Sequence, residues 1–231
     1  RICCDTETTG FQYYNGHKIV GMSFGWSIYH FYVPVRHEDS LTGGAQPAQL
    51  DMDELRPDLQ KLFARKDLIT IWQNAKFDHH FYKADGIDIL CPFHDTRIEW
   101  QFIDENAPGA LKTIASGWRD YMGIWHKGIV HKDAKADEKH ISDWRTEEAK
   151  ARRNAFSAEL KNITGIRASE IRFQGWKKND IKKWVRENDL ADHPYRKTEK
   201  NDIHYGYLPI IDMVKYAALD TYLTMCLHEH C

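Results

Sequence analysis

The chain has 231 residues, a formal net charge of −2 and an ordinary globular composition, with 42% hydrophobic and 13% aromatic residues. This length allows one sizeable domain, or one domain that carries an insertion. No apolar run approaches the length of a membrane span and no signal-peptide pattern opens the sequence, so we expect neither a membrane partner nor secretion.

Cysteine usage indicates the redox compartment. The sequence contains five cysteines, an odd number, and none of them lies in a C-x-x-C spacing. We therefore expect reduced thiols in an intracellular protein, cytoplasmic or nucleoid-associated. Because the sequence starts directly before an apolar strand and stops inside a helical pattern, we also expect it to be part of a longer polypeptide.

The first expected element is a strand that ends in an acidic pair. Residues 2–10 read ICCDTETTG, in which Asp5 and Glu7 are two positions apart. Strand residues alternate between faces, so these two carboxylates are predicted to point to the same side. Their mutual repulsion, about 4 kcal/mol at 4 Å in a surface-like dielectric, would be relieved by a divalent cation. A pair of solvated acids in a turn is the alternative.

Strands and helices follow in an order typical of an α/β protein. Residues 18–26 and 29–35 predict a β-hairpin, because only two residues connect them. After a loop, Asp51 is expected to cap a helix that ends at about residue 64. Residues 67–72 predict a buried strand, and a helix to about residue 84 comes next. Asp95 is expected to cap a helix over residues 96–103, and another is expected over residues 110–122. This order favours a mixed sheet flanked by helices.

Residues 124–205 differ in character from the rest of the chain. They hold 19 Lys and Arg against 14 Asp and Glu, and four of the eight tryptophans. We expect helices near residues 142–160 and 179–188, so that the stretch forms a mostly helical insertion. It could be a module packed on its own tryptophans or a surface that guides a nucleic-acid strand.

The last element is a long helix from Pro209 to about residue 230. Its apolar positions, among them Ile211 and Val214, recur at helical spacing and predict a buried stripe. Tyr216 and Asp220 are four residues apart and therefore share a face. A buried Asp220 would need a partner.

The three acidic motifs together make the sequence recognisable. The strand D-x-E, the segment N-x-x-F-D ending at Asp78, and Y-x-x-x-D from Tyr216 to Asp220 follow one another in this order. The chain resembles the proofreading 3′–5′ exonuclease domain of family A DNA polymerases, in the tyrosine branch of the four-carboxylate exonucleases. The resemblance covers about residues 1–122 and 206–231. It implies a ribonuclease H-like α/β fold that spans residues 1–231, with residues 124–205 as an insertion.

The resemblance also implies roles for individual residues. Asp5, Glu7 and Asp220 would hold one divalent metal, and Asp5 would bridge to a second that Asp78 supports through water. An all-oxygen ligand set suits two Mg²⁺ or Mn²⁺ ions. Tyr216 and Glu7 would orient the attacking water. The reaction would release nucleoside monophosphates from a single-stranded 3′ end.

Further residues would contact the nucleic acid in this interpretation. Phe11 stands where the family places an apolar side chain against the terminal base, and Gln73 and Asn74 would touch the backbone of the frayed strand. The expected partners are a single-stranded DNA 3′ end and a polymerase domain attached after residue 231.

Two other functions remain open from the sequence. One is a stand-alone exonuclease of the ribonuclease D type, which would process RNA 3′ ends with the same four acids. The other is a non-catalytic module that positions a primer strand or binds a partner. The intact carboxylates favour catalysis over the second alternative.

Overall fold

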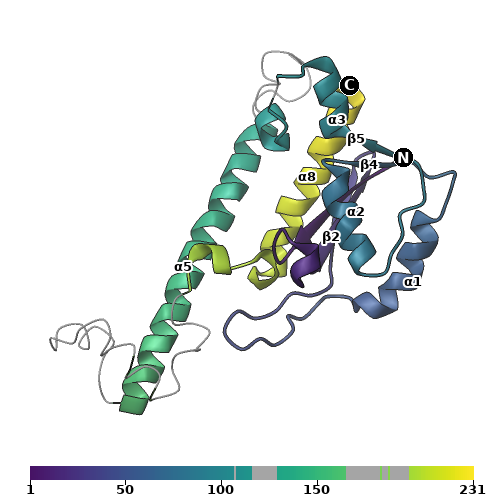
Figure 1. Ribbon diagram of the computed structural model, residues 1–231. Helices are drawn as coiled ribbons and strands as arrows, with labels where there is room; N and C mark the ends of the chain where they lie inside the picture. The colour runs from purple at the N-terminus through teal and green to yellow at the C-terminus, as the bar shows by residue number, and fades with distance from the viewer. Residues whose placement is uncertain (107, 116–128, 165–182, 184–186, 188–197) are drawn as a thin grey trace. The chain divides into compact units, whose positions relative to one another are not determined.

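The computed structural model describes residues 1–231 except 107, 116–128, 165–182, 184–186 and 188–197 (Figure 1). The described residues form two compact units, Arg1–Ile141 with His204–Cys231, and Ser142–Ile203. Among them, no helix combines the length and the apolar character that a membrane crossing requires. Their five cysteines are free thiols, four of them buried.

A five-stranded mixed sheet in the order β3-β2-β1-β4-β5 is the centre of the first unit. Its strands are β1 (Ile2–Thr8), β2 (Ile19–Trp26), β3 (Tyr29–Pro34), β4 (Thr70–Trp72) and β5 (Phe93–Asp95). The β1–β2 and β2–β3 pairs are antiparallel, whereas the β1–β4 and β4–β5 pairs are parallel. The predicted hairpin and mixed sheet are thus present, and the acidic strand β1 is its central strand.

Helices cover both faces of this sheet. Helices α1 (Met52–Phe63) and α2 (Ala75–Ala84) contribute Phe63, Phe81 and Tyr82 to the main hydrophobic core, on the side that Cys4 faces. The long helix α8 (Ile210–His230) packs against the other face (Figure 1). Cys3 and Ile71 contact Met225 there. The two neighbouring cysteines therefore mark the two faces of β1.

Helix boundaries follow local signals closely in the first unit. The Asp51 side chain accepts a hydrogen bond from the Asp53 amide and caps α1. Asp95 does the same for Arg97 at the start of α3 (Thr96–Ile103). Pro209 directly precedes α8. Polar side chains and proline at these positions satisfy or avoid the free amides of a first turn.

Several boundaries differ from the sequence prediction. The strand expected over residues 67–72 is limited to β4, and the short strand β5 was not predicted, because its three residues show no alternation of polar and apolar side chains. The helix expected over residues 142–160 is part of the longer α5 (Ile129–Thr164). Of the helix expected over residues 110–122, residues 110–115 are described, and residues 111–115 are helical. Most of the helix expected near residues 179–188 lies outside the described residues.

The stripe expected on the last helix was also wrong. Ile211 is 77% exposed and Val214 is 38% exposed, whereas Met213, Ala217 and Thr221 are buried. Small side chains let the helix approach the sheet closely, and a search for large apolar residues overlooks them.

The second unit, residues 142–203, is held by hydrogen bonds to backbone carbonyls. Arg145 donates to the carbonyl of Ile203 and Arg153 to that of Thr198. The 3₁₀ turn η2 (Lys200–Asp202) is closed by a reciprocal cap between Glu199 and Asp202. Whether residues 124–205 act as an inserted module stays a prediction.

Candidate functional site

Strand β1 presents two acids on the face that α8 covers. Asp5 and Glu7 have the same parity as Cys3, which contacts Met225 of α8. Glu7 is only 6% exposed. Its strand partner is Gly21 on β2, where a Cβ atom would lie 1.9 Å from the hydroxyl oxygen of Tyr32. Glycine at this position therefore leaves room for the Tyr32 ring beside the acidic strand.

Helix α8 adds the third acid to this face. One carboxylate oxygen each from Asp5, Glu7 and Asp220 lies within 4.8 Å of the other two. The structure therefore brings together residues that are more than 200 positions apart in the sequence. Three hard oxygen donors at this separation could hold Mg²⁺ or Mn²⁺, which prefer oxygen ligands.

A lysine that was not predicted as a site residue contacts this cluster. The Nζ atom of Lys112 lies 3.2 Å from both oxygens of Asp220 and 3.5 Å from Glu138 Oε1. The side chains of Lys112 and Asp220 are only 17% and 14% exposed. Lys112 is the partner that a buried Asp220 requires. The available signal was its position between apolar residues of a short helix that packs on α8, in the sequence Leu111-Lys112-Thr113-Ile114.

Asp78 approaches β1 from α2, on the opposite face. Its Oδ1 atom accepts hydrogen bonds from the backbone amide of Thr6 at 2.9 Å and from the Thr6 hydroxyl at 2.7 Å. It is not among the three acids whose oxygens lie within 4.8 Å. Nevertheless, Asp78 acts on the cluster. Burial raises the pKa of Asp5 well above its usual value, and the charge of Asp78 is the next largest cause. Asp78 is therefore a neighbour of the three-acid cluster, and its hydrogen bonds with Thr6 fix its position.

The pKa values of all four carboxyl groups are raised above their usual values. Burial, followed by the charge of Asp220, raises the pKa of Glu7 to about 8. Burial raises the pKa of Asp78 to about 7, although its hydrogen bonds with Thr6 act in the opposite direction. Burial also raises the pKa of Asp220, against the lowering effect of Lys112. The pKa of Lys112 is itself raised, because Asp220, Glu138 and Glu7 outweigh the lowering effect of burial. Without a further cation, this site holds fewer negative charges than it has carboxyl groups.

The donor set fits a divalent metal by a second criterion. Asp220 Oδ1 is buried and makes no hydrogen bond within the described part of the chain, although it lies at ion-pair distance from Lys112. Buried polar atoms are usually satisfied, and a cation bound between the three carboxylates would satisfy Asp220 Oδ1.

Tyr216 borders the cluster one turn before Asp220. Its ring stacks on Tyr205 with centroids 5.9 Å apart, and Lys112 Nζ lies 3.8 Å from its ring centroid. Burial raises the pKa of the Tyr216 hydroxyl well above its usual value, so this group stays protonated at neutral pH. It can therefore both donate and accept a hydrogen bond.

Comparison with known proteins gives one relative. No family model matches the chain. A stretch of 133 residues is 25% identical to DNA polymerase I from Borreliella burgdorferi (strain ATCC 35210 / DSM 4680 / CIP 102532 / B31). The match covers 57% of this chain and 14% of that polymerase. The chain is thus similar to a small part of a DNA polymerase.

The three residues expected to touch nucleic acid lie in different environments. Phe11 is 85% exposed, and its ring lies 6.4 Å from that of Phe77, edge to face. The amide group of Gln73 is used at both ends, since its nitrogen donates to the Gly109 carbonyl and its oxygen accepts from Thr96. Asn74 has a φ of 66°, a left-handed conformation that asparagine tolerates. Phe11 is free to meet a ligand, whereas the contacts of Gln73 favour a structural role. Their binding of nucleic acid stays a prediction.

Proposed function

We propose that this chain is a metal-dependent 3′–5′ exonuclease with a ribonuclease H-like fold, which removes nucleoside monophosphates from single-stranded 3′ ends. The observation that carries the proposal is the convergence of Asp5, Glu7 and Asp220 within 4.8 Å on one face of the sheet. The order of the acids along the chain and the similarity to a DNA polymerase I support it.

The residues of the site have distinct tasks in this proposal. Asp5, Glu7 and Asp220 bind divalent metal, and Asp78 supports a second ion at Asp5 through water. Two bound Mg²⁺ or Mn²⁺ ions supply the activation of water and the stabilisation of the leaving 3′ oxygen. Tyr216 and Glu7 orient the attacking water towards the last phosphodiester. Lys112 fixes the Asp220 carboxylate by its contacts with both oxygens.

We also propose that the exonuclease serves an attached DNA polymerase, in a polypeptide longer than these 231 residues. The name of the relative, DNA polymerase I, supports DNA as the substrate and a polymerase as the partner. Phe11, which is 85% exposed and follows the acidic strand β1 in the sequence, would then pack against the terminal base.

The decisive experiment follows a 5′-labelled single-stranded oligonucleotide. We expect a ladder of products shortened from the 3′ end in Mg²⁺ or Mn²⁺, none in excess chelator, and recovery when metal is restored. Asp5→Ala and Asp220→Ala should each remove nearly all activity. Asp58→Ala is the matched control, because Asp58 is an exposed acid of α1 that forms an ion pair with Lys61 across one helical turn.

Three results would overturn parts of the proposal. Undiminished cleavage in excess chelator would exclude a metal mechanism. Binding of the oligonucleotide without cleavage, by protein whose circular dichroism shows a folded state, would favour a non-catalytic module. Faster degradation of RNA than of DNA of the same sequence would favour an enzyme of the ribonuclease D type.

A further inference from the structure

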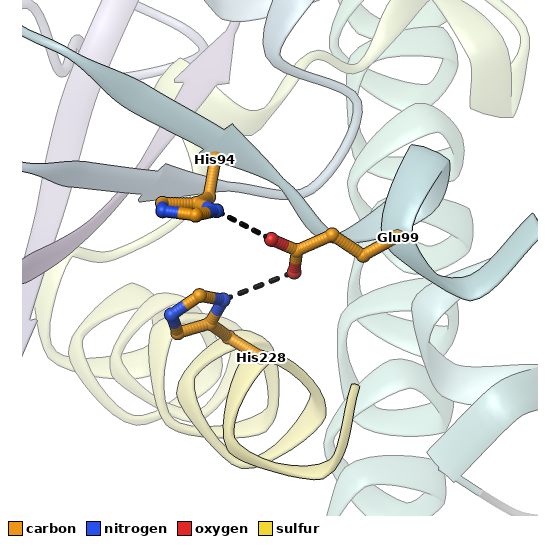
Figure 2. A group of neighbouring side chains, drawn as sticks. All are labelled: His94, Glu99 and His228. Carbon is orange, nitrogen blue, oxygen red and sulfur yellow. Dashed lines mark hydrogen bonds and ion pairs between the residues drawn. The ribbon is translucent and has the colours of Figure 1, made fainter. Parts of the chain in front are cut away.

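A second group of metal-binding side chains lies where β5, α3 and α8 meet. It consists of His94 on β5, Glu99 on α3 and His228 on α8 (Figure 2). One ligand atom of each residue lies within 4.8 Å of the others. The three acids of the proposed active site share no residue with this cluster, so the two can be tested separately.

Both imidazoles point at the same carboxylate, as Figure 2 shows. His94 Nδ1 lies 2.6 Å from Glu99 Oε1, and His228 Nδ1 lies 3.0 Å from Glu99 Oε2. The imidazole rings are 4.6 Å apart between centroids. The three side chains are partly shielded, with exposed fractions of 41% for His94, 21% for Glu99 and 9% for His228.

We propose that His94, Glu99 and His228 form a binding site for Zn²⁺ or a similar transition-metal ion. Two imidazole nitrogens and one carboxylate oxygen are a common set of three protein ligands for zinc, with a fourth position left for water. Imidazole suits zinc, cobalt or nickel, whereas Mg²⁺ prefers oxygen ligands. The cluster therefore differs in metal preference from the all-oxygen site of Asp5, Glu7 and Asp220.

The present contacts need only a small change to accept the ion. Ligand atoms about 2.0–2.1 Å from a tetrahedral zinc ion are roughly 3.3 Å from each other. The contact of 2.6 Å between His94 and Glu99 Oε1 and that of 3.0 Å between His228 and Glu99 Oε2 would therefore lengthen by about 0.7 and about 0.3 Å. His94 is the most exposed of the three ligands and so has the most room to adjust.

Arg1 is the cationic group that faces the cluster. Its Nη1 atom lies 3.4 Å from His228 Nε2. When His228 binds metal through Nδ1, the proton of the neutral ring moves to Nε2, which can then no longer accept a hydrogen bond from Arg1. The Arg1 contact therefore has to open. Arg1 is exposed, so its guanidinium can turn towards water.

A metal at this position would join three elements of the sheet edge. It would link the end of α8 to β5 and to α3, by bonds to residues up to 134 positions apart. The same helix carries Asp220, eight residues before His228 and therefore about 12 Å along the helix axis. The expected role is structural: the ion would hold the helix that supplies an acid to the other site.

The test measures zinc binding in protein that lacks the all-oxygen site. In an Asp5→Asn/Asp220→Asn background, isothermal titration with Zn²⁺ should give one bound ion per chain, and Zn²⁺ should raise the melting temperature. His228→Asn and Glu99→Gln should each weaken zinc binding by about tenfold or more, and Zn²⁺ should no longer raise the melting temperature of these variants. His230→Asn is the matched control, since His230 lies on the same helix end and contacts Trp100 instead of the cluster.

Cobalt provides an independent readout. Co²⁺ bound by these three ligands with a low coordination number should give intense visible absorption, and His94→Asn should remove it. The proposal is overturned if the background variant binds no zinc, or if His228→Asn and Glu99→Gln bind it as tightly as the control. Neither result depends on nuclease activity, so failure here leaves the proposed function standing.

Discussion

The Nζ atom of Lys112 lies 3.2 Å from each carboxylate oxygen of Asp220. This ion pair joins the short helix that contains Lys112 to α8, and it is the only cationic contact that the structure gives Asp220 among the described residues. Part of the negative charge of the acidic cluster is thus compensated by the protein itself. The remainder is available to a metal.

We predict that Lys112→Met shifts the pH dependence of nuclease activity. Removing the positive charge should raise the pKa of Asp220 and of Glu7, because Lys112 lowers both. The acids would then bind metal only at higher pH, so the rising limb of the pH–rate profile should move to higher pH. Lys112→Arg keeps the charge and is the control. An unchanged profile in Lys112→Met would show that Asp220 does not depend on this lysine.

The metal-free protein should lose stability as the pH rises. The pKa of Glu7 is about 8 in the folded protein against an ordinary 4.5, so between these values the folded state binds a proton that the unfolded state has released. The free energy of unfolding of the metal-free protein must therefore fall as the pH rises between these two pKa values, by up to a few kcal/mol. Urea unfolding in chelator at several pH values measures this slope.

The Glu7→Gln variant shows whether Glu7 causes this fall in stability with pH. The variant should be more stable than the parent at pH 8 and nearly equal to it at pH 4, and saturating Mg²⁺ should restore much of the parent's stability at pH 8. A parent protein whose stability rises over the same window would contradict the raised pKa of Glu7.

Tyr216→Phe should lower kcat by roughly 10–10³-fold with little change in KM, since its proposed task of orienting water matters mainly in the transition state. Steady-state kinetics on a single-stranded oligonucleotide provide the measurement. Tyr29→Phe, at an exposed tyrosine that packs on Trp26, serves as the control. A kcat equal to that of the parent would assign Tyr216 to packing alone.

Gly21→Ala should destabilise the protein by about 1–3 kcal/mol, because the new methyl group would lie 1.9 Å from the Tyr32 hydroxyl oxygen and 2.1 Å from Cζ. The displaced Tyr32 would lose its 2.8 Å hydrogen bond with His37. Thermal unfolding checks the effect against Gly44→Ala, where the nearest atom lies 3.4 Å away. In a Tyr32→Ala background the same substitution should cost much less, and an equal cost there would point to a cause other than Tyr32.

Local patterns were sufficient to predict much of this structure. The alternation along a strand was enough to expect Asp5 and Glu7 on one face, and helical spacing was enough to pair Tyr216 with Asp220. The caps Asp51 and Asp95 fixed the starts of α1 and α3, because a carboxylate accepts the free amides of a first turn.

Contacts between segments that are distant in the sequence could not be predicted from local patterns. Lys112 lies between apolar residues of a short helix, but no local pattern indicates that it meets Asp220, 108 residues away. The group of His94, Glu99 and His228 has no characteristic spacing, since two of its members are five residues apart and the third follows 129 residues later. The buried face of α8 was missed for a different reason, because small residues such as Ala217 and Thr221 pack against the sheet there.

The alternating acids of β1 also restrict how this protein can change. Thr6 faces α2, where it binds Asp78, while its neighbours Asp5 and Glu7 face α8. The pairing with β2 is irregular after Glu7, where Val20 is the extra residue on β2. Deleting or inserting one residue before Asp5 would turn both acids into the apolar core and place Thr6 on the face that α8 covers. Variation within β1 should therefore consist of substitutions, and never of a change in its length.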